Sequence, residues 1–375
     1  MCLMKLDIGG AETHVVELSK ELRRRGYNVI AASNGGVYVK ELENAGIKHY
    51  NVPLQNKNPL NVIKAFRQLR DIIEKENITI VHSHARIPSF IIGRLHRKMN
   101  FHFVTTTHWV FTTKYGLKYI TDWGEKTVAV SEDIKRYLMD NYGTPEENIF
   151  TTINGIDTEK FSADTDCAGI KKEFDIKDGE RVIVSVSRLD ESRSLASKQL
   201  ISVCERLNEK IDNLRVIIVG DGDDFANVSA MAEEVNKKTG RNTVTLTGSR
   251  VDINNIIAAG ELFVGVSRAA LEAMACRKPV IITGNEGYIG LFSPDKLDTA
   301  KETNFCCRFC PAPEAETLYD DIIRYFAMPD KEKNSLAEFS RKVILSDYSA
   351  AKMADDTIMA YNALLGQTSA AWKGK

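Results

Sequence analysis

The spacing of hydrophobic positions alternates along the first half of the chain between a helical period and short apolar runs. Apolar residues recur at the spacing of one helix face over 10–25, and Gly26 ends that pattern. The same criteria predict helices over 60–76 and 132–141, and strands over 28–33, 78–83, 101–107 and 127–130. Strands and helices that alternate in this way are typical of a parallel sheet covered on both faces.

A polar stretch over 162–179 interrupts the alternation, which then starts again. The pattern predicts strands over 182–187, 214–219 and 243–246, with helices over 196–207 and 225–238. Because 375 residues exceed the usual size of a single core, we expect two doubly wound, Rossmann-like α/β domains. We place them at 1–163 and 164–347, followed by a final amphipathic helix within 348–375.

The beginning of the chain fits this pattern poorly. A doubly wound domain normally opens with a full apolar strand, and residues 1–6 supply only a short one. We therefore expect the first strand to be abbreviated, or the chain to begin inside it.

Composition narrows the class of partner. The formal net charge is -1, from 50 Lys+Arg against 51 Asp+Glu, which argues against nucleic acid as a bulk electrostatic partner. The sequence has neither the roughly 20 consecutive apolar residues of a membrane helix nor a signal-peptide pattern, so we expect a cytoplasmic protein. Seven cysteines, an odd number, suit a reducing compartment. The C-x2-C at 307–310 has no second Cys or His pair at finger spacing, which disfavours a zinc finger.

Ligands of open α/β sheets bind beyond the carboxyl ends of the strands, so the turns after predicted strands are the first places to look for chemistry. Gly9 and Gly10 stand between a strand and a helix, where backbone N–H groups and the helix dipole favour an anion. Paired glycines also form ordinary tight turns, which is the alternative.

Histidines follow two strands of the first half. His82 and His84 end one strand, and His108 ends the next. Residues at i and i+2 face the same side of a strand, so a metal pair is possible. Without a third ligand in the pattern, histidines with satisfied hydrogen bonds are the simpler interpretation. His108 is of more interest because it stands at a strand end.

Two cations follow the first strand of the second half. Arg188 stands just past the strand end and Arg193 five residues later, so the pair can clamp a diphosphate from two sides. Ordinary surface arginines are the alternative. Further along, Gly220 begins a glycine turn after a strand, without the G-x-G-x-x-G spacing of a dinucleotide fingerprint. That absence weighs against a dehydrogenase.

An acidic residue interrupts an apolar helix over 269–275, and a buried strand follows it, so Glu272 is expected to be buried. A buried carboxylate is costly without a partner. Ser267 is expected to be the N-cap of this helix, where the turn offers N–H groups to a phosphate. Because Glu272 can accept hydrogen bonds from ribose hydroxyls, a sugar nucleotide is its expected partner.

Seven motifs occur in a fixed order along nearly the whole chain. They are GGAETHVVELSKELRRRGYNV from Gly9, the strand-end His108, VAVSEDIKRYL over 128–138, INGIDTEKF over 153–161, SRLDESR over 187–193, VGDGDD over 219–224 and SRAALEAMACRKPVI over 267–281. Together they resemble the family 4 group of retaining, nucleotide-sugar-dependent glycosyltransferases. The resemblance implies the GT-B fold, in which two Rossmann-like domains face a central cleft and the final helix packs back toward the N-terminal domain.

The resemblance also implies roles for residues. Arg188 and Arg193 match the basic pair that neutralises the donor diphosphate, and Glu272 matches the glutamate that binds ribose. The further donor contacts that it implies are Gly10, Gly220, Val251, Ser267 and Arg268. The implied acceptor side comprises Gly9, Gly10 and His108, and the implied catalytic set is His108, Arg188, Arg193 and Glu272.

This family resemblance implies hexose transfer with retention, without a cofactor and without a metal, since fixed cations act where charge develops on the departing diphosphate. A UDP-sugar is favoured over a GDP-sugar. Two departures matter. Val264 replaces the first of two family glutamates, so sugar contacts are expected from backbone near 284–287. Arg277 takes the place of a helix-ending glycine, at a left-handed position where a side chain is costly.

The acceptor is a hydroxyl compound that the sequence does not identify. A basic face that includes Lys57, Lys64, Arg67 and Arg70 is compatible with a lipid-linked acceptor at the inner face of the cell membrane, in cell-envelope glycan or glycolipid synthesis. A solvated helix face is the alternative. Two other functions stay open at this point: a sugar-nucleotide epimerase of the same fold, and a non-catalytic binding subunit.

Overall fold

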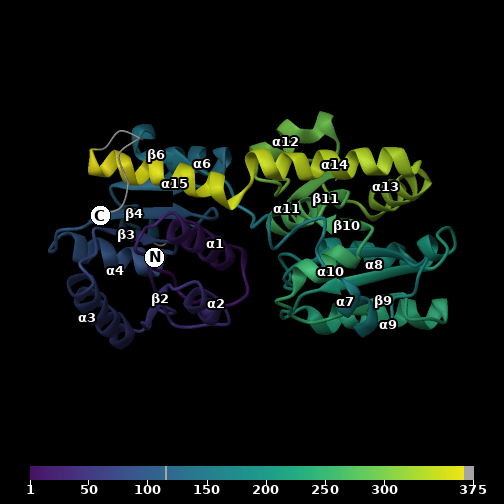
Figure 1. Cartoon of the computed structure of the whole chain (residues 1–375), viewed down its shortest axis with the longest axis horizontal. Coiled ribbons are helices and arrows are strands. Elements are labelled where there is room, and N and C mark those ends of the chain that lie inside the picture. Colours follow the sequence, from purple (N-terminus) through teal and green to yellow (C-terminus); the bar gives the residue numbers. More distant parts are fainter. Residues whose placement is uncertain (115, 367–375) are drawn as a thin grey trace. The chain divides into compact units, whose positions relative to one another are not determined.

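The computed structural model describes residues 1–114 and 116–366. The chain forms two compact units. Unit 1 combines Met1–Gly155 with the chain from Ala350 onward, and unit 2 is Ile156–Ser349. Each unit consists of a mainly parallel sheet with helices on both of its faces (Figure 1).

The boundaries between the units lie a few residues from the expected positions after 163 and 347. Ile156 already belongs to unit 2, because it pairs with Ser349 in a parallel bridge. Its N–H donates to the carbonyl of Tyr348 at 2.8 Å. The two segments that connect the units therefore pair with each other.

The sheet of unit 1 has the order β2-β1 followed by β3-β4-β5-β6, and Cys2 joins the two parts through parallel bridges to Ala32 and Ser83. The abbreviated first strand is thus a single bridging residue. The strands are β1 (Ile30–Ser33), β2 (Lys48–Asn51), β3 (Ile80–Ser83), β4 (His102–Thr107), β5 (Lys126–Ala129) and β6 (Ile149–Thr151).

Two hydrophobic cores cover the two faces of this sheet. One contains Leu18 of α1, Val104 of β4 and Ala360 of α15. The other contains Leu69 of α3 and Ile92 of α4, packed on the opposite face. The helices of unit 1 are α1 (Gly10–Arg24), α2 (Val39–Asn44), α3 (Pro59–Lys75), α4 (Arg86–His96), α5 (Leu117–Ile120), α6 (Glu132–Tyr142), the 3-10 turn η1 (Glu146–Asn148) and α15 (Ala350–Leu365).

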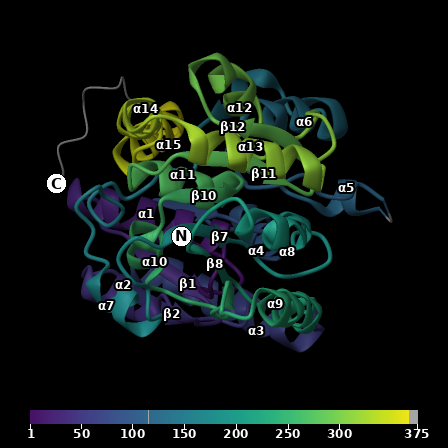
Figure 2. The same ribbon diagram turned by 90° about the vertical axis from the view of Figure 1, so that its right-hand side faces the viewer.

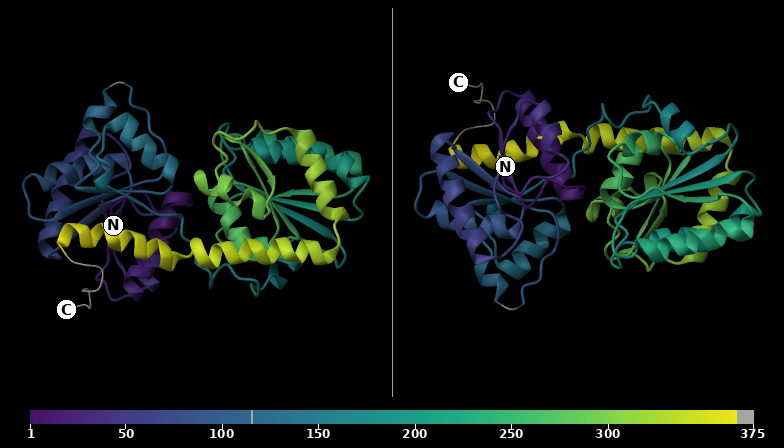
Figure 3. Two further views of the ribbon diagram at one scale, coloured as in Figure 1. Left: turned by 90° about the horizontal axis from the view of Figure 1, so that it is seen from above. Right: turned by 90° about the horizontal axis from the view of Figure 1, so that it is seen from below.

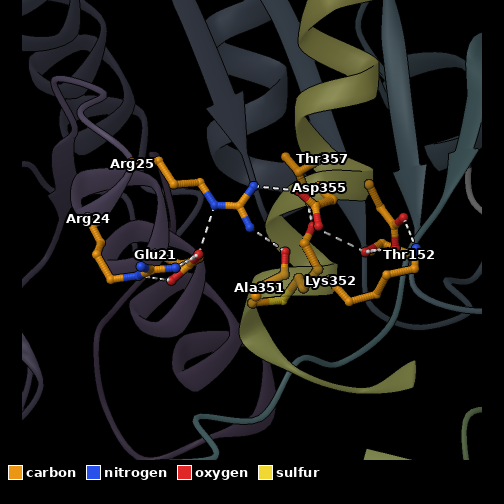
Figure 4. Close-up of polar contacts among 10 residues, drawn as sticks. Glu21, Arg24, Arg25, Thr152, Ala351, Lys352, Asp355 and Thr357 are labelled. Carbon is orange, nitrogen blue, oxygen red and sulfur yellow. Dashed lines mark hydrogen bonds and ion pairs between the residues drawn. The ribbon is translucent and has the colours of Figure 1, made fainter. Parts of the chain in front are cut away.

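Arg25, at the end of α1, ties the last helix to the first. Its guanidinium donates to Asp355 Oδ1 at 2.5 Å and to the carbonyl of Ala351 at 2.7 Å, while its Nε donates to Glu21 at 2.8 Å (Figure 4). On the other side of α15, the Thr152 hydroxyl donates to Asp356 at 3.3 Å. Helix α15 is therefore an integral part of unit 1.

Unit 2 has the sheet order β12-β11-β10-β7-β8-β9, in which β12 alone is antiparallel among the described strands. Figure 3 shows the twisted strands of each unit between layers of helices. The strands are β7 (Arg181–Val186), β8 (Leu214–Val219), β9 (Val244–Leu246), β10 (Leu262–Gly265), β11 (Val280–Gly284) and β12 (Gly287–Leu291).

Apolar residues of three helices form the core on one face of this sheet, where Leu200 of α8, Val228 of α9 and Ile322 of α13 pack on the strands. Helices α8 and α9 also lie side by side (Figure 2). The helices of unit 2 are α7 (Ala168–Glu173), α8 (Leu195–Asn208), α9 (Phe225–Thr239), α10 (Ile253–Ala259), α11 (Ser267–Ala275), the 3-10 turn η2 (Pro294–Lys296), α12 (Leu297–Glu302), α13 (Ala315–Ala327) and α14 (Asp330–Asp347).

The end of α11 provides a test of backbone strain. Arg277 has φ 58°, the left-handed conformation expected from the glycine that it replaces. A side chain there costs on the order of 1 kcal/mol, and the Arg277–Glu338 ion pair at 2.5 Å is exposed and offsets little. We expect Arg277→Gly to raise the free energy of unfolding in urea by about 1 kcal/mol. Arg277→Ala removes the ion pair but keeps the Cβ, so an equal gain in that control would contradict the explanation.

Candidate functional site

The strand order of unit 2 reverses beside its first strand. The chain runs from β7 outward to β8 and β9, and then returns to the other side of β7 with β10. In open α/β sheets, ligands bind beyond the carboxyl ends of the strands at such a reversal. Arg188 follows β7 and Ser267 follows β10. Two of the segments selected from the sequence thus flank the position where a ligand is expected.

The loop after β7 is held rigidly against the loop after β8. The N–H of Leu189 donates to the Asp221 carbonyl at 3.0 Å, and the N–H of Asp224 donates to the Leu189 carbonyl at 2.9 Å. At Gly220, a Cβ atom would lie only 1.8 Å from the carbonyl oxygen of Ser187. Gly220 is therefore required for the close approach of these loops, whatever it contributes to a ligand.

A cluster of polar side chains also holds the same two loops together. Asp224 accepts hydrogen bonds from the Ser194 hydroxyl and from Asn227 Nδ2 at 3.1 Å, and its carboxylate lies 2.6 Å from Lys198 Nζ. The Lys198 ammonium is the main cause that lowers the pKa of Asp224 to about 2, followed by the Ser194 hydrogen bond. The charge of Lys198 is thus compensated by Asp224 within unit 2.

The two expected cations lie on this fixed loop, and both are exposed. Arg193 lies 3.7 Å from the Asp190 carboxylate, a distance at which the ion pair is weak. The turn between β11 and β12 lies beside the loop, because Asn285 accepts from the N–H of Leu195 at 3.2 Å and its amide donates to the Glu191 carbonyl at 3.4 Å. The backbone near 284–287, from which sugar contacts are predicted, therefore lies against the loop that carries the two cations.

The start of α11 differs from the prediction. Val266 occupies the cap position, and Ser267 is the first residue of the helix with φ 55° and without a capping hydrogen bond from its side chain. The N–H of Ser267 donates to the carbonyl of Phe305 at 2.7 Å. This amide, which was expected to meet a donor phosphate, already has a partner from a distant segment that local sequence could not indicate.

Glu272 is buried, as predicted, but its partner is a residue of its own helix. Arg268 Nε donates to Glu272 Oε1 at 2.9 Å, and both side chains are 8% exposed. Burial raises the pKa of Glu272, and the Arg268 charge opposes that shift. Residues at i and i+4 meet on one helix face, so Arg268 already compensates this carboxylate, and the contact of Glu272 with a sugar nucleotide stays a prediction. Val251, another expected donor contact, lies in the loop before α10 and is exposed.

In unit 1, the predicted residues gather at the carboxyl edge of the sheet, where the strand order reverses at Cys2. Gly9 precedes α1, and its carbonyl accepts from the N–H and the hydroxyl of Thr13 at 2.9 and 2.8 Å. Gly10 begins that helix. The turn formed by Gly9 and Gly10 therefore lies at the same edge of the sheet as His84 and His108.

Two of those histidines meet there. His84 Nδ1 lies 3.2 Å from His108 Nε2. Burial is the main cause that lowers the pKa of His84 well below its usual value, so this imidazole is neutral at physiological pH. His14 joins them from α1, with its ring centroid 4.7 Å from that of His108. Sequence reasoning missed His14, although its place one helical turn after Gly10 could have indicated that it faces the sheet edge.

Other candidate features lie away from these residues. A cavity of about 220 Å³ in unit 1 is found at the amino ends of β1 and β3, and its lining includes His82 but not His14, His84 or His108. Cys307 and Cys310 are free thiols, and within 1–114 and 116–366 no metal-ligand group includes them. No helix in the described part of the chain combines the length and apolar character needed to cross a bilayer.

Comparison with known proteins identifies the family. The model of "Glycosyltransferase Family 4" matches residues 8–160, and that of "Glycosyl transferases group 1" matches residues 168–343. The chain belongs to the family 4, group 1 glycosyltransferases. It is thus a hexosyltransferase. The predicted GT-B class of fold is confirmed.

Individual relatives of this glycosyltransferase are distant but extend over most of its length. N-acetyl-alpha-D-glucosaminyl L-malate synthase of Bacillus anthracis is 22% identical and covers 91% of this chain and 93% of its own. The phosphatidylinositol N-acetylglucosaminyltransferase GPI3 subunit of Saccharomyces cerevisiae is 24% identical, covering 93% and 82%. Anabaena Alr3699/HepE, solved in complex with UDP and glucose, has a TM-score of 0.71 at 16% identity, covering 96% and 99%.

The Asp224 cluster predicts how stability depends on pH. Because the folded state lowers the pKa of Asp224 to about 2, its ion pair stabilises the protein above the unfolded carboxyl pKa and is lost as pH falls toward 2. We expect the Tm of the wild type to fall more steeply than that of Asp224→Asn between about pH 5 and pH 2.

The matched control is Asp223→Asn, which changes an exposed neighbouring carboxylate. Scanning calorimetry across the same pH series measures all three proteins. Parallel Tm curves for the wild type and Asp224→Asn would show that the cluster does not contribute as described.

Proposed function

We propose that this glycosyltransferase transfers a hexose from a UDP-sugar to a hydroxyl acceptor with retention of configuration. The observation that carries the proposal is the position of the Arg188 loop and the start of α11 on either side of the strand reversal in unit 2. The Anabaena structure, which contains UDP and glucose, supports a UDP donor. The names of the two relatives make UDP-N-acetylglucosamine the first donor to test.

The exposed guanidinium groups of Arg188 and Arg193 bind the diphosphate in this proposal. As the bond between the sugar C1 and the diphosphate oxygen breaks, negative charge develops on the leaving group, and fixed cations stabilise it. The acceptor oxygen attacks C1 from the same face, and its proton passes to the departing phosphate. This sequence of events needs neither a cofactor nor a metal.

In this proposal Glu272 accepts a hydrogen bond from the donor ribose through only one of its two carboxylate oxygens. Arg268 occupies Oε1, so Oε2 is the oxygen that would accept a ribose hydroxyl. The Arg268 charge opposes the rise in pKa that burial causes at Glu272, and a charged acceptor forms the stronger hydrogen bond. In unit 1, we assign His108, Gly9 and Gly10 to the acceptor side.

Replacing Arg188 tests the leaving-group role. Arg188→Ala should lower turnover at least about 100-fold, because a preorganised charge at the developing anion is lost, while the exposed position leaves Tm unchanged. Lys210→Ala, an exposed cation after α8 at the other edge of the sheet, is the matched control. Turnover is measured with the donor selected by thermal shift among UDP-, GDP- and ADP-sugars.

In the thermal-shift comparison of the three nucleotide sugars, a donor at 100 times its Kd should stabilise the protein by about 2.7 kcal/mol. Wild-type turnover in Arg188→Ala would refute the assignment of the cation. An epimerised sugar nucleotide formed without acceptor would refute the transfer reaction itself.

A surface of α3 favours a lipid-linked acceptor. Leu60 and Ile63 are 76% and 50% exposed, and Lys64 and Arg67 are also exposed. Their spacing of i, i+3, i+4 and i+7 places all four on one face of the helix. Apolar side chains beside cations are the composition of a helix that lies on an anionic membrane. We propose that this face contacts the cytoplasmic leaflet, where the acceptor is presented.

Sedimentation with liposomes tests the membrane contact. The wild type should bind vesicles that contain anionic lipid better than neutral ones, and added salt should weaken binding. The double variant Lys64→Glu with Arg67→Glu should reduce binding more than about tenfold, since each basic residue near the surface contributes about 1 kcal/mol. Lys237→Glu in α9 is the control. Equal sedimentation of the α3 and α9 variants would rule out this surface.

A further inference from the structure

Three histidines from separate elements converge at the carboxyl edge of the unit 1 sheet. His14 comes from α1, His84 follows β3 and His108 follows β4. One ring nitrogen of each lies within 4.8 Å of the others. Among the histidine, cysteine and acidic side chains of 1–114 and 116–366, this is the one group that has the arrangement of a metal-ligand set.

The spacing fits a small tetrahedral ion. Nitrogen ligands at 2.0–2.1 Å from Zn²⁺ lie about 3.3 Å from each other. His84 Nδ1 and His108 Nε2 are already 3.2 Å apart. The remaining separation, at most 4.8 Å, closes to a ligand distance when a ring shifts by on the order of 1 Å.

The burial of the group also fits a ligand set. His14 and His84 are buried, and His108 is half-buried. The Nε2 atom of His84 is buried and has no hydrogen-bond partner among the described residues. The spacing assigns Nδ1 of His84 to the ion, so this Nε2 is the outer nitrogen of the ring.

The surroundings orient one of the three rings. His14 Nδ1 lies 3.3 Å from Asn154 Oδ1, the kind of outer contact that fixes the ring of a metal-ligating histidine. Behind them, His82 has both ring nitrogens in hydrogen bonds at 2.7 Å, to Tyr361 and to Thr106. His82 is thus a structural residue outside the group of three.

We propose that His14, His84 and His108 bind one transition-metal ion of the zinc type through three imidazole nitrogens, with a water or hydroxyl in the fourth position. Imidazole is a preferred ligand of Zn²⁺ and its neighbours in the transition series. This ion is not needed for sugar transfer. Resting on the proposed function, which assigns His108 to the acceptor side, the ion occupies a residue that the reaction needs and so inhibits transfer.

Metal binding is tested first, without any substrate. The EDTA-treated full chain is titrated with Zn²⁺ by calorimetry and with Co²⁺ by absorption spectroscopy, and we expect one ion per chain with the visible bands of tetrahedral Co²⁺. His84→Gln and His108→Gln should each weaken binding at least about tenfold. His102→Gln, a half-buried histidine outside the group, is the matched control. Circular dichroism establishes that each variant is folded.

Cobalt also distinguishes the ligands, since a cysteine thiolate adds a near-ultraviolet charge-transfer band that an all-imidazole site lacks. Unchanged binding in His84→Gln, or a thiolate band in the wild type, would overturn the site regardless of activity. Turnover is then measured with EDTA and with added Zn²⁺. Inhibition that chelation reverses supports the competition, and full turnover of the Zn²⁺-loaded enzyme overturns it. Lack of turnover in EDTA would count against the proposed function alone.

Discussion

The reversal of strand order in each parallel sheet is the constraint on which the remaining features depend. Parallel strands are joined by helical crossovers, and both faces of the sheet are covered only when the chain turns back past its first strand. In unit 2 this happens between β7 and β10, and in unit 1 it happens at Cys2. The loops that leave the sheet there diverge to opposite faces. Side chains far apart in sequence, such as Arg188 and Ser267, are brought to one edge for that reason.

Much of the fold could be predicted because its central strands are fully buried. The strand β8 is buried throughout, and its apolar run over 216–219 ends where predicted. By contrast, β2 was missed, since its residues Lys48–Asn51 are exposed or half-buried and show no apolar run. The loops that carry the candidate site could be located in the sequence for the same reason, as they follow the buried strands directly. A strand at the edge of a sheet has little hydrophobic signal to detect.

The sequence indicated where the residues of the candidate site lie, but it did not indicate which residues they contact. The bond from Ser267 to Phe305 joins residues far apart in sequence, and nothing local indicates it. The Arg268–Glu272 pair was within reach, because the i to i+4 spacing is visible in the sequence, but the burial of an arginine was not expected. A buried ion pair stabilises little overall, yet loss of either partner leaves an uncompensated charge. Glu272 therefore has a structural function in addition to any contact with a ligand.

The attachment of α15 to α1 through Arg25 has a consequence for the order of folding during synthesis. Unit 2 is inserted within unit 1, so all of Ile156–Ser349 is translated before the last helix of unit 1 exists. The surface of α1, β4, β5 and β6 on which α15 packs therefore lacks this helix on the ribosome until unit 2 has been completed. Unit 1 is thus the first unit to begin synthesis and the second to finish folding. Its final step is the docking of α15 against a surface that is already formed.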